Sequence, residues 1–366
     1  MKFNISSYGY FGYYFAYELY KKNNLNKLFT NLPNYKTNQI SRKFVKNNFL
    51  LALPYVLNKI YLNNLSYSIN YHFIEKYDEW VSKNLVQSDI FHSFSSYGLK
   101  SQRVSKKRYN TMNVIERGSS HIDYQISILK EEYNRFSIPF PKINKKIIEK
   151  ELQEYSECDY ITVQSTFAKK TFIENGINEK KIIKIPLGVD LKKFYPTEKK
   201  DKVFRVLYAG SLSVRKGIYY LLEATKNINL NNFEIVLNGT VENDIKELIR
   251  PYTNQFTLNK PIPFNQLYKL YSQASVFVLP TIEDGFAKVI TELMACGVPV
   301  IATTNSSAPD IITDGLDGFI VPIRDPKIIK EKILFLYENP KIREMMSINA
   351  IKKAKKILNN ENYIYK

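Results

Sequence analysis

The sequence contains few cysteines and no hydrophobic run long enough to cross a bilayer. Cys158 and Cys296 are the only cysteines among 366 residues, so neither a disulfide framework nor a zinc site is indicated and a reducing compartment is expected. The first residues lack the basic start and continuous apolar core of a signal peptide, and they are typical of a first strand. The apolar run from Phe49 to Leu53 is too short to span a membrane, and Pro54 interrupts it. We therefore expect a cytoplasmic protein.

Acidic residues are too few to balance the basic ones. The formal net charge is +18, with 53 Lys and Arg against 35 Asp and Glu. The lysines are scattered and no nucleic-acid-binding motif accompanies them, so no specific nucleic-acid partner is predicted. A basic surface that attracts anionic membrane lipids or a lipid diphosphate acceptor fits this charge better.

Two segments could form such a surface. Residues Arg42 to Tyr61 interleave basic and apolar side chains, and the segment from Lys100 to Arg108 also holds Arg103, Lys106, Lys107 and Arg108. The first segment could be an interfacial helix in peripheral contact with a membrane or a core helix of the first domain, and the core helix is the more common case.

Apolar runs and helical stretches alternate twice along the chain, which is typical of parallel α/β sheets. Strands are predicted at Phe3–Ile5, Lys27–Thr30, Ile90–His92, Met112–Ile115, Tyr160–Val163, Ile182–Ile185, Phe204–Ala209, Phe233–Leu237, Val276–Leu279, Val300–Ala302 and Phe319–Val321. Residues Ser41 to Val86 read as an expanded helical region.

A chain of 366 residues is larger than one hydrophobic core usually supports. We predict a first domain over residues 1–195, a linker at Phe194 to Lys202, a second domain over residues 203–345, and a C-terminal helix over residues 346–366.

The segment LPTIEDGFAKVITELMACGVPVI, from Leu279 to Ile301, is the most informative part of the chain. It predicts a buried strand, a turn with two carboxylates and a glycine, a helix that ends at Gly297, and a second strand. Ligands of open parallel sheets bind at the carboxyl ends of strands, where the N–H groups of the next helix attract anions. Asp284 and Glu292 stand eight residues apart, so one carboxylate can face each end of a ligand. A solvated helix face with carboxylates near its positive end is the alternative interpretation.

This segment closely resembles the sugar-nucleotide signature of the family-four glycosyltransferases. In that family a Glu, a Gly-Phe-Gly turn, a second Glu eight residues after the first and an Ala-Cys-Gly-x-Pro-Val run occur together; here the same positions hold Asp284, Gly285 to Ala287, Glu292 and Ala295 to Val300. The resemblance implies the GT-B arrangement, with two Rossmann-like doubly wound domains facing across a cleft. It also implies a last helix, Ile351 to Tyr365, that crosses back to the first domain.

Further matches to the family cover almost all of residues 160–325. Gly188-Val189-Asp190 resembles the end of the family's first domain, AGSLSVRKG at Ala209 to Gly217 resembles the loop that opens the second, and Asp314 to Phe319 resembles its Asp-Gly-x-x-Gly-Phe turn.

The loop from Ala209 to Gly217 is expected to bind the diphosphate, because a leaving diphosphate gains charge and needs cationic donors. Lys216 takes the family's phosphate-binding lysine position. Ser211 stands where the family has an arginine, so that cation is absent. Arg215 is the obvious substitute, unless it is a solvated loop charge.

The resemblance assigns the ribose hydroxyls to Glu292 and the sugar to the first acidic position. By spacing that position is Asp284, but Glu283 precedes it and reaches further, so either could contact the sugar. Sugar hydroxyls or phosphate would also bind backbone N–H groups at the start of the helix, those of Gly285, Phe286 and Ala287. Ala287 replaces a family glycine, so donor preference is expected to differ from that of relatives.

On the acceptor side, the resemblance places His121, in NVIERGSSHIDYQ, near the reaction centre. A structural hydrogen-bonding role is the alternative for this histidine. Further acceptor-side candidates follow predicted strands: His92, Glu116, and the loop glycines Gly9 and Gly12. His72 is expected to be structural.

The resemblance implies a retaining hexosyltransferase that moves a sugar from a nucleotide diphosphate donor to a hydroxyl of a glycan, glycolipid or lipid-linked acceptor, in surface polysaccharide synthesis. No Asp-x-Asp metal motif occurs, and neither a metal nor a cofactor is expected. A GT-B sugar-nucleotide epimerase or phosphorylase, and a catalytically silent scaffold of this fold, remain alternatives.

Overall fold

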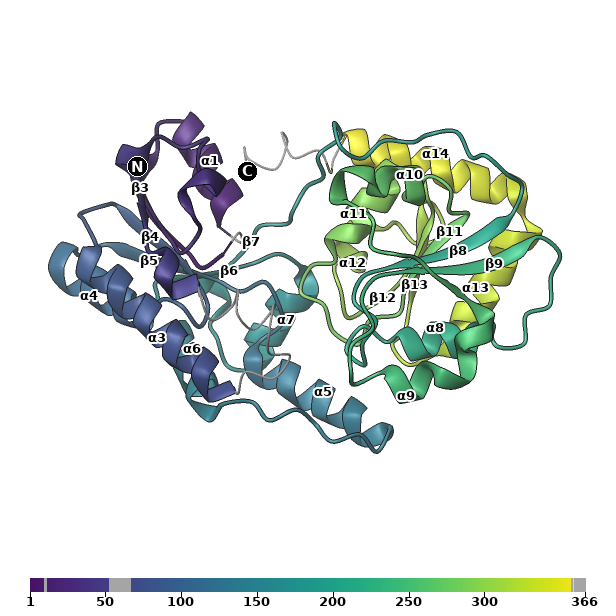
Figure 1. The fold of residues 1–366 in the computed structure, drawn as a ribbon, viewed down its shortest axis with the longest axis horizontal. Coiled ribbons are helices and arrows are strands. Elements are labelled where there is room, and N and C mark those ends of the chain that lie inside the picture. The colour runs from purple at the N-terminus through teal and green to yellow at the C-terminus, as the bar shows by residue number, and fades with distance from the viewer. Residues whose placement is uncertain (10–11, 53–66, 357, 359–366) are drawn as a thin grey trace. The chain divides into compact units, whose positions relative to one another are not determined.

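The structure is a computed structural model that describes residues 1–9, 12–52, 67–356 and 358. Its internal contacts divide the chain into two compact units. Unit 1 comprises Met1–Arg117, Pro141–Val163 and Phe172–Ile183, and unit 2 comprises Gly118–Phe140, Gln164–Thr171 and Lys184–Lys366. Each unit contains one parallel sheet with helices packed on it (Figure 1). Two α/β domains with parallel sheets were predicted, and this is confirmed.

The sheet of unit 1 has seven strands in the order β3-β2-β1-β4-β5-β6-β7. Their bounds are β1 Phe3–Ser7, β2 Leu25–Thr30, β3 Val45–Asn47, β4 Ile90–Phe94, β5 Met112–Glu116, β6 Tyr160–Val163 and β7 Ile182–Lys184.

Helices cover both faces of this sheet, because successive strand residues point to opposite sides. Leu28 of β2 packs in a cluster with Leu19 of α1 (Tyr13–Lys21), whereas the next residue, Phe29, packs with Tyr77 of α3 (Tyr67–Asn84). Helices α4 (Leu99–Tyr109) and α6 (Lys145–Glu157) continue the layer of α3.

The sheet of unit 2 has six strands in the order β10-β9-β8-β11-β12-β13. Their bounds are β8 Phe204–Ala209, β9 Phe233–Asn238, β10 Thr257–Leu258, β11 Val276–Leu279, β12 Val300–Thr303 and β13 Gly318–Val321. Every residue of β11 and β12 is buried, which explains their uninterrupted apolar sequences. The helices are α8 Ile218–Thr225, α9 Lys246–Ile249, α10 Leu267–Tyr271, α11 Lys288–Ala295, α12 Ala308–Ile311, α13 Pro326–Glu338 and α14 Pro340–Lys356.

Helix α5 (Ile122–Arg135) belongs to unit 2 by its contacts, although the expected boundary at residue 195 would assign it to the first domain. The buried Glu132 carboxylate explains this, because it accepts hydrogen bonds at 2.5 Å from the hydroxyl of Tyr220 and from Nε of Arg324. Helix α7 (Thr166–Glu174) is divided between the units after Thr171.

The predicted helical region between Ser41 and Val86 is only partly helical. Helix α3 agrees with it, but Arg42–Phe44 and Phe49–Ala52 are 3-10 turns and Val45–Asn47 is the edge strand β3. The prediction of a helix from Arg42 to Tyr61 is therefore wrong as far as Ala52, because this segment pairs in parallel with β2. Its remainder lies outside the described residues.

The structure also describes the expected linker and part of the expected C-terminal helix. The segment Phe194 to Lys202, expected as a linker, lies within unit 2, where the ring of Phe194 stacks on that of Tyr271 at 5.9 Å. Of the expected crossing helix Ile351 to Tyr365, the part up to Lys356 continues α14, which packs on α11; residues 357 and 359–366 lie outside the described part of the chain.

In each sheet the strand order reverses once near its centre, between β1 and β4 in unit 1 and between β8 and β11 in unit 2. Loops that leave the carboxyl ends of two such strands diverge to opposite faces and leave a crevice, which is where open α/β sheets bind ligands. The loops predicted to carry the functional residues follow these strands.

Candidate functional site

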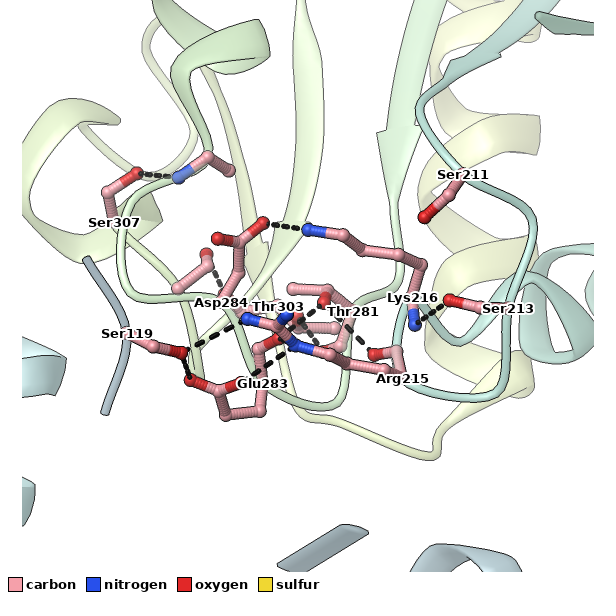
Figure 2. A network of polar contacts seen from close by, with 12 residues as sticks. Ser119, Ser211, Ser213, Arg215, Lys216, Thr281, Glu283, Asp284, Thr303 and Ser307 are labelled. Carbon is pink, nitrogen blue, oxygen red and sulfur yellow. Dashed lines mark hydrogen bonds and ion pairs between the residues drawn. The ribbon is translucent and has the colours of Figure 1, made fainter. Parts of the chain in front are cut away.

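Two loops meet where the strand order of unit 2 reverses. Residues 210–217 follow β8 and residues 280–287 follow β11 (Figure 2). Gly217 permits the contact, because its φ is +63° and a Cβ there would lie 2.0 Å from the carbonyl oxygen of Pro280. The N–H of Ile282 donates to the carbonyl of Arg215 at 2.9 Å and fixes the register of the loops.

Two ion pairs join these loops side by side. Arg215 donates from Nε to the Glu283 carboxylate at 2.9 Å, and the ammonium of Lys216 contacts the Asp284 carboxylate (Figure 2). The consecutive residues Arg215 and Lys216 therefore serve different partners. Both predicted acidic candidates lie next to the predicted cations, so the structure brings these four residues together.

Glu283 is completely buried, and its carboxylate accepts five hydrogen bonds. Besides Arg215, the donors are the Ser119 hydroxyl at 2.7 Å, the Ser120 N–H at 3.0 Å, the Ser120 hydroxyl at 2.8 Å and the Gln125 amide at 2.9 Å. Burial alone would raise the pKa of this carboxyl, but the charge of Arg215 and these donors outweigh it and lower the pKa to about 2. Glu283 is therefore ionised and saturated by protein donors.

The turn after Asp284 exposes backbone donors at the start of α11. No hydrogen bond from the N–H of Gly285 or of Phe286 to another described residue is found, whereas the N–H of Ala287 donates to the Ser307 hydroxyl at 3.2 Å. Gly285 also lies against the backbone of unit 2 at Gly118, whose carbonyl oxygen would be 2.4 Å from a Cβ at position 285. Of the three predicted N–H donors, only that of Ala287 has an acceptor among the described residues.

Glu292 lies on α11, and only 6% of the residue is exposed. No hydrogen bond or ion pair of its carboxylate to any described residue is found. Burial raises the pKa of Glu292 to about 7, with Lys288 opposing the rise only in part. A buried carboxylate without protein donors is unfavourable when ionised, and a ligand with two hydroxyl groups would supply the missing donors.

His121 caps α5 and is 2% exposed. Its Nδ1 accepts a hydrogen bond from the backbone N–H of Asp123 at 3.3 Å, and the backbone N–H of His121 donates to the Thr171 hydroxyl at 3.0 Å. By contacts His121 belongs to unit 2, with Lys216 and Glu292.

The acceptor-side candidates of unit 1 lie on β4 and β5 and in the segment that follows β1. His92 and Glu116, on the neighbouring strands β4 and β5, lie 3.2 Å apart at Nε2 and Oε2, and His92 is 5% exposed. Gly9 has a φ of +72°, and its N–H donates to the Asn31 side chain at 2.7 Å. Gly12 packs so tightly that a Cβ would meet the Phe94 ring at 2.8 Å.

Ser211 lies apart from the two ion pairs, and the residues besides Arg215 that donate to Glu283 were not predicted. Ser211 accepts a hydrogen bond from the Tyr208 hydroxyl at 2.6 Å through its backbone oxygen, and Figure 2 shows its side chain apart from the ion pairs. The donors to Glu283 were missed, namely Ser119, Ser120 and Gln125. One signal for them was present, namely the run of small polar residues before His121.

A family model and several curated relatives match part of this chain. Residues 190–353 match the family model described as glycosyl transferases group 1. An uncharacterized glycosyltransferase of Methanocaldococcus jannaschii is 30% identical over 41% of this chain and 43% of its own length. The N,N'-diacetylbacillosaminyl-diphospho-undecaprenol alpha-1,3-N-acetylgalactosaminyltransferase of Campylobacter jejuni is 24% identical over 83% of this chain and 81% of its own length. The matched part of this chain thus covers only about two fifths of the length of the Methanocaldococcus jannaschii relative.

Solved structures share the fold over the whole chain. A sucrose-phosphate synthase from Thermosynechococcus elongatus covers 100% of this chain and 96% of its own, with a TM-score of 0.76 and 19% identity. Anabaena HepE in complex with UDP covers 99% of this chain and 97% of its own, with a TM-score of 0.69 and 14% identity. The fold is that of the GT-B glycosyltransferases, and residues 190–353 match the family model of the group 1 glycosyl transferases.

Proposed function

We propose that the protein is a retaining glycosyltransferase that uses a nucleoside diphosphate sugar as donor and a hydroxyl group as acceptor. One observation carries the proposal. The loops and helix that follow β8 and β11 of unit 2 carry the Lys216–Asp284 pair, the N–H groups of Gly285 and Phe286, and the Glu292 carboxylate. For these two N–H groups and for this carboxylate, no partner is found among the residues that the structure describes. These groups match the cation, donor and acceptor needs of a diphosphate, a sugar and a ribose.

Each group has a distinct role in this proposal. When a donor binds, the ammonium of Lys216 turns from Asp284 to the diphosphate, which offers more negative charge. The freed Asp284 carboxylate then accepts hydrogen bonds from sugar hydroxyls, and the N–H groups of Gly285 and Phe286 bind the phosphate oxygens at the start of α11. Glu292 accepts from the two ribose hydroxyls.

The reaction needs no carboxylate base. The bond between the anomeric carbon and the phosphate oxygen breaks, and the acceptor oxygen forms its bond to that carbon on the same face. The acceptor proton passes to the departing phosphate oxygen, whose growing charge Lys216 stabilises. Because Lys216 and the helix start neutralise the leaving group, we infer that the reaction is independent of metal.

The acceptor is proposed to be a glycan or a lipid-linked sugar. Two relatives support this by their names, since the Campylobacter jejuni enzyme and an Escherichia coli alpha-1,3-galactosyltransferase both act on a sugar-diphosphoundecaprenol. His92 and Glu116 are the candidates to contact the acceptor hydroxyl, and the Gly9 loop lies at the same edge of the sheet of unit 1.

Peripheral contact of unit 1 with anionic lipid at a cytoplasmic membrane face is also proposed. Between Glu18 and Glu75 the sequence has eight Lys and Arg and no Asp or Glu. Within this interval Leu50 is 69% exposed and Phe49 41% exposed. No helix in the described ranges is both long and apolar enough to cross a membrane. The second basic segment is less suited to lipid, because Arg103 and Lys106 already pair with acidic side chains.

Lipid contact is tested by sedimentation with vesicles of phosphatidylcholine alone or with phosphatidylglycerol added. Charge reversal at Arg42, Lys43 and Lys46 should abolish binding to the anionic vesicles, at about 1 kcal/mol for each cation lost. The matched control reverses three exposed lysines of unit 2, Lys341, Lys352 and Lys355. Equal loss in both triple variants would reject a specific lipid-facing surface on unit 1.

The donor site is tested by calorimetry with UDP, GDP and ADP. We expect one of these to bind and Glu292→Gln to weaken it by about 1 to 3 kcal/mol. If none binds, or if the variant binds as well as the wild type, the proposed donor site is wrong.

A further inference from the structure

The Glu283 carboxylate joins three segments that are distant in the sequence. Its Oε1 accepts from Ser119 and Ser120, which precede α5, and its Oε2 accepts from Gln125 of α5 and from Arg215 of the loop after β8. All of these residues lie in unit 2. The segments that carry His121, Lys216 and Asp284 are therefore attached to one buried charge (Figure 2).

Two features show that Glu283 has no capacity left for a ligand. A carboxylate has about four lone-pair positions, and here five donors occupy them. The side chain is also completely buried, so a sugar hydroxyl could reach it only by displacing a protein donor. The same contacts occupy Arg215, which donates to Glu283 from Nε and to the Ser119 hydroxyl at 3.1 Å from Nη2.

The backbone supports the same attachment. Gly285 lies so close to residues 118 and 119 that a Cβ would be 2.4 Å from the Gly118 oxygen and from the Ser119 Cα. The turn that carries Asp284 thus packs directly on the loop that leads to His121. Any side chain at position 285 would push this turn and this loop apart.

We propose that Glu283 is a positioning residue, which together with Arg215 clamps residues 118–125 onto the loop that carries Asp284. In this account Glu283 touches neither sugar nor phosphate, and Arg215 neutralises Glu283 instead of the diphosphate. The clamp fixes His121 and Asp284 relative to Lys216. This inference deepens the proposed function and rests on it for the reaction, whereas the clamp itself can be measured without turnover.

The test compares Glu283→Gln with a control, Glu247→Gln, which alters a glutamate whose side chain is 84% exposed. Amide hydrogen exchange of residues 118–125, measured with saturating UDP, should accelerate about tenfold or more in Glu283→Gln only, because a charged hydrogen-bond network is lost. With UDP-glucose as donor, kcat should fall about 10²-fold, the scale of a small misplacement of catalytic groups. The Kd for UDP should stay within about twofold.

A double variant separates positioning from direct contact. Since Glu283→Gln leaves the Arg215 charge without its partner, adding Arg215→Gln should lower kcat by less than the product of the two single effects. If Glu283→Gln does not fold, Gln125→Met removes a single donor to Oε2 and should give the same pattern with smaller changes.

Three results would overturn the inference. Unchanged exchange of residues 118–125 would show that no clamp exists, a raised KM for UDP-glucose with normal kcat would indicate a direct sugar contact, and multiplicative single effects would separate Arg215 from Glu283. If the wild type transfers sugar from no donor, the proposed function fails, and the exchange measurement still decides the clamp.

Discussion

Replacing Glu292 by glutamine should stabilise the protein at neutral pH, although it removes a residue proposed to bind ligand. Burial raises the pKa of the Glu292 carboxyl from 4.5 to about 7, and no described residue donates a hydrogen bond to it. Because folding raises this pKa, the free energy of unfolding falls as pH rises and the carboxyl ionises. Glutamine has nearly the same size and never carries that charge.

The magnitude follows from the pKa. A rise from 4.5 to about 7 corresponds to about 3 kcal/mol, at about 1.4 kcal/mol for each unit. Below pH 4.5 the carboxyl is protonated in both folded and unfolded chains, so the variant gains nothing there. The gain grows between pH 4.5 and 7 and is complete at pH 8, where it would raise Tm by roughly 6 to 12 °C for a unit of this size.

Thermal unfolding of wild type and Glu292→Gln from pH 4 to pH 8, without ligand, measures this difference. UDP provides a second assay, because its ribose hydroxyls need the ionised acceptor. We therefore compare the affinity for UDP with that for 2′-deoxy-UDP, because the titration of the phosphates cancels in their ratio. This ratio should rise about tenfold from pH 6 to pH 8 in the wild type and stay constant in the variant. A variant that is no more stable than the wild type at pH 8 would refute the reasoning, since the carboxylate would then have partners.

The remaining predictions concern the two loops. Lys216→Ala should lower turnover by about 10²-fold, the effect of losing one electrostatic stabiliser, and unchanged single-turnover rates would place the diphosphate elsewhere. Asp284→Asn should leave the calorimetric affinity for UDP intact while it impairs transfer; a loss of UDP affinity would contradict its assignment to the sugar. Glu283→Gln should destabilise the protein above pH 4.5, and the deficit should shrink as pH falls towards 2, because the folded-state pKa of Glu283 is lowered to about 2; denaturant melts that show a constant deficit would exclude an ionised Glu283. Gly285→Ala should reduce transfer, because its Cβ would force the loop away from residue 118, and unchanged transfer would contradict this close packing.

Much of the fold could be predicted because central strands such as β11 are both buried and apolar at every position. The expected strand Val276–Leu279 matches β11 residue for residue, and its four residues are all buried. The strands that were missed, Val45–Asn47 and Thr257–Leu258, are short edge strands with intermediate or exposed residues. Their conformation is set by hydrogen bonds to a neighbouring strand, which no local pattern records.

The candidate site was predictable where its residues stand in one segment. The spacing from Asp284 to Glu292 needs only the loop and helix between them, and both occur as expected. The role of Glu283 could not be predicted, because its donor Ser119 lies 164 residues away. A local pattern shows two adjacent acids and cannot reveal which of them is saturated by protein donors.

The central claim is tested most directly by incubating the protein with radiolabelled UDP- and GDP-sugars and a polyprenyl-diphosphate-linked sugar. The account predicts a single glycosylated lipid product, formed from one donor with retention of anomeric configuration by NMR, and about 10²-fold less product with Lys216→Ala. Conversion of the donor to an epimer without a glycosylated product would contradict it, as would product formed at the wild-type rate by Lys216→Ala.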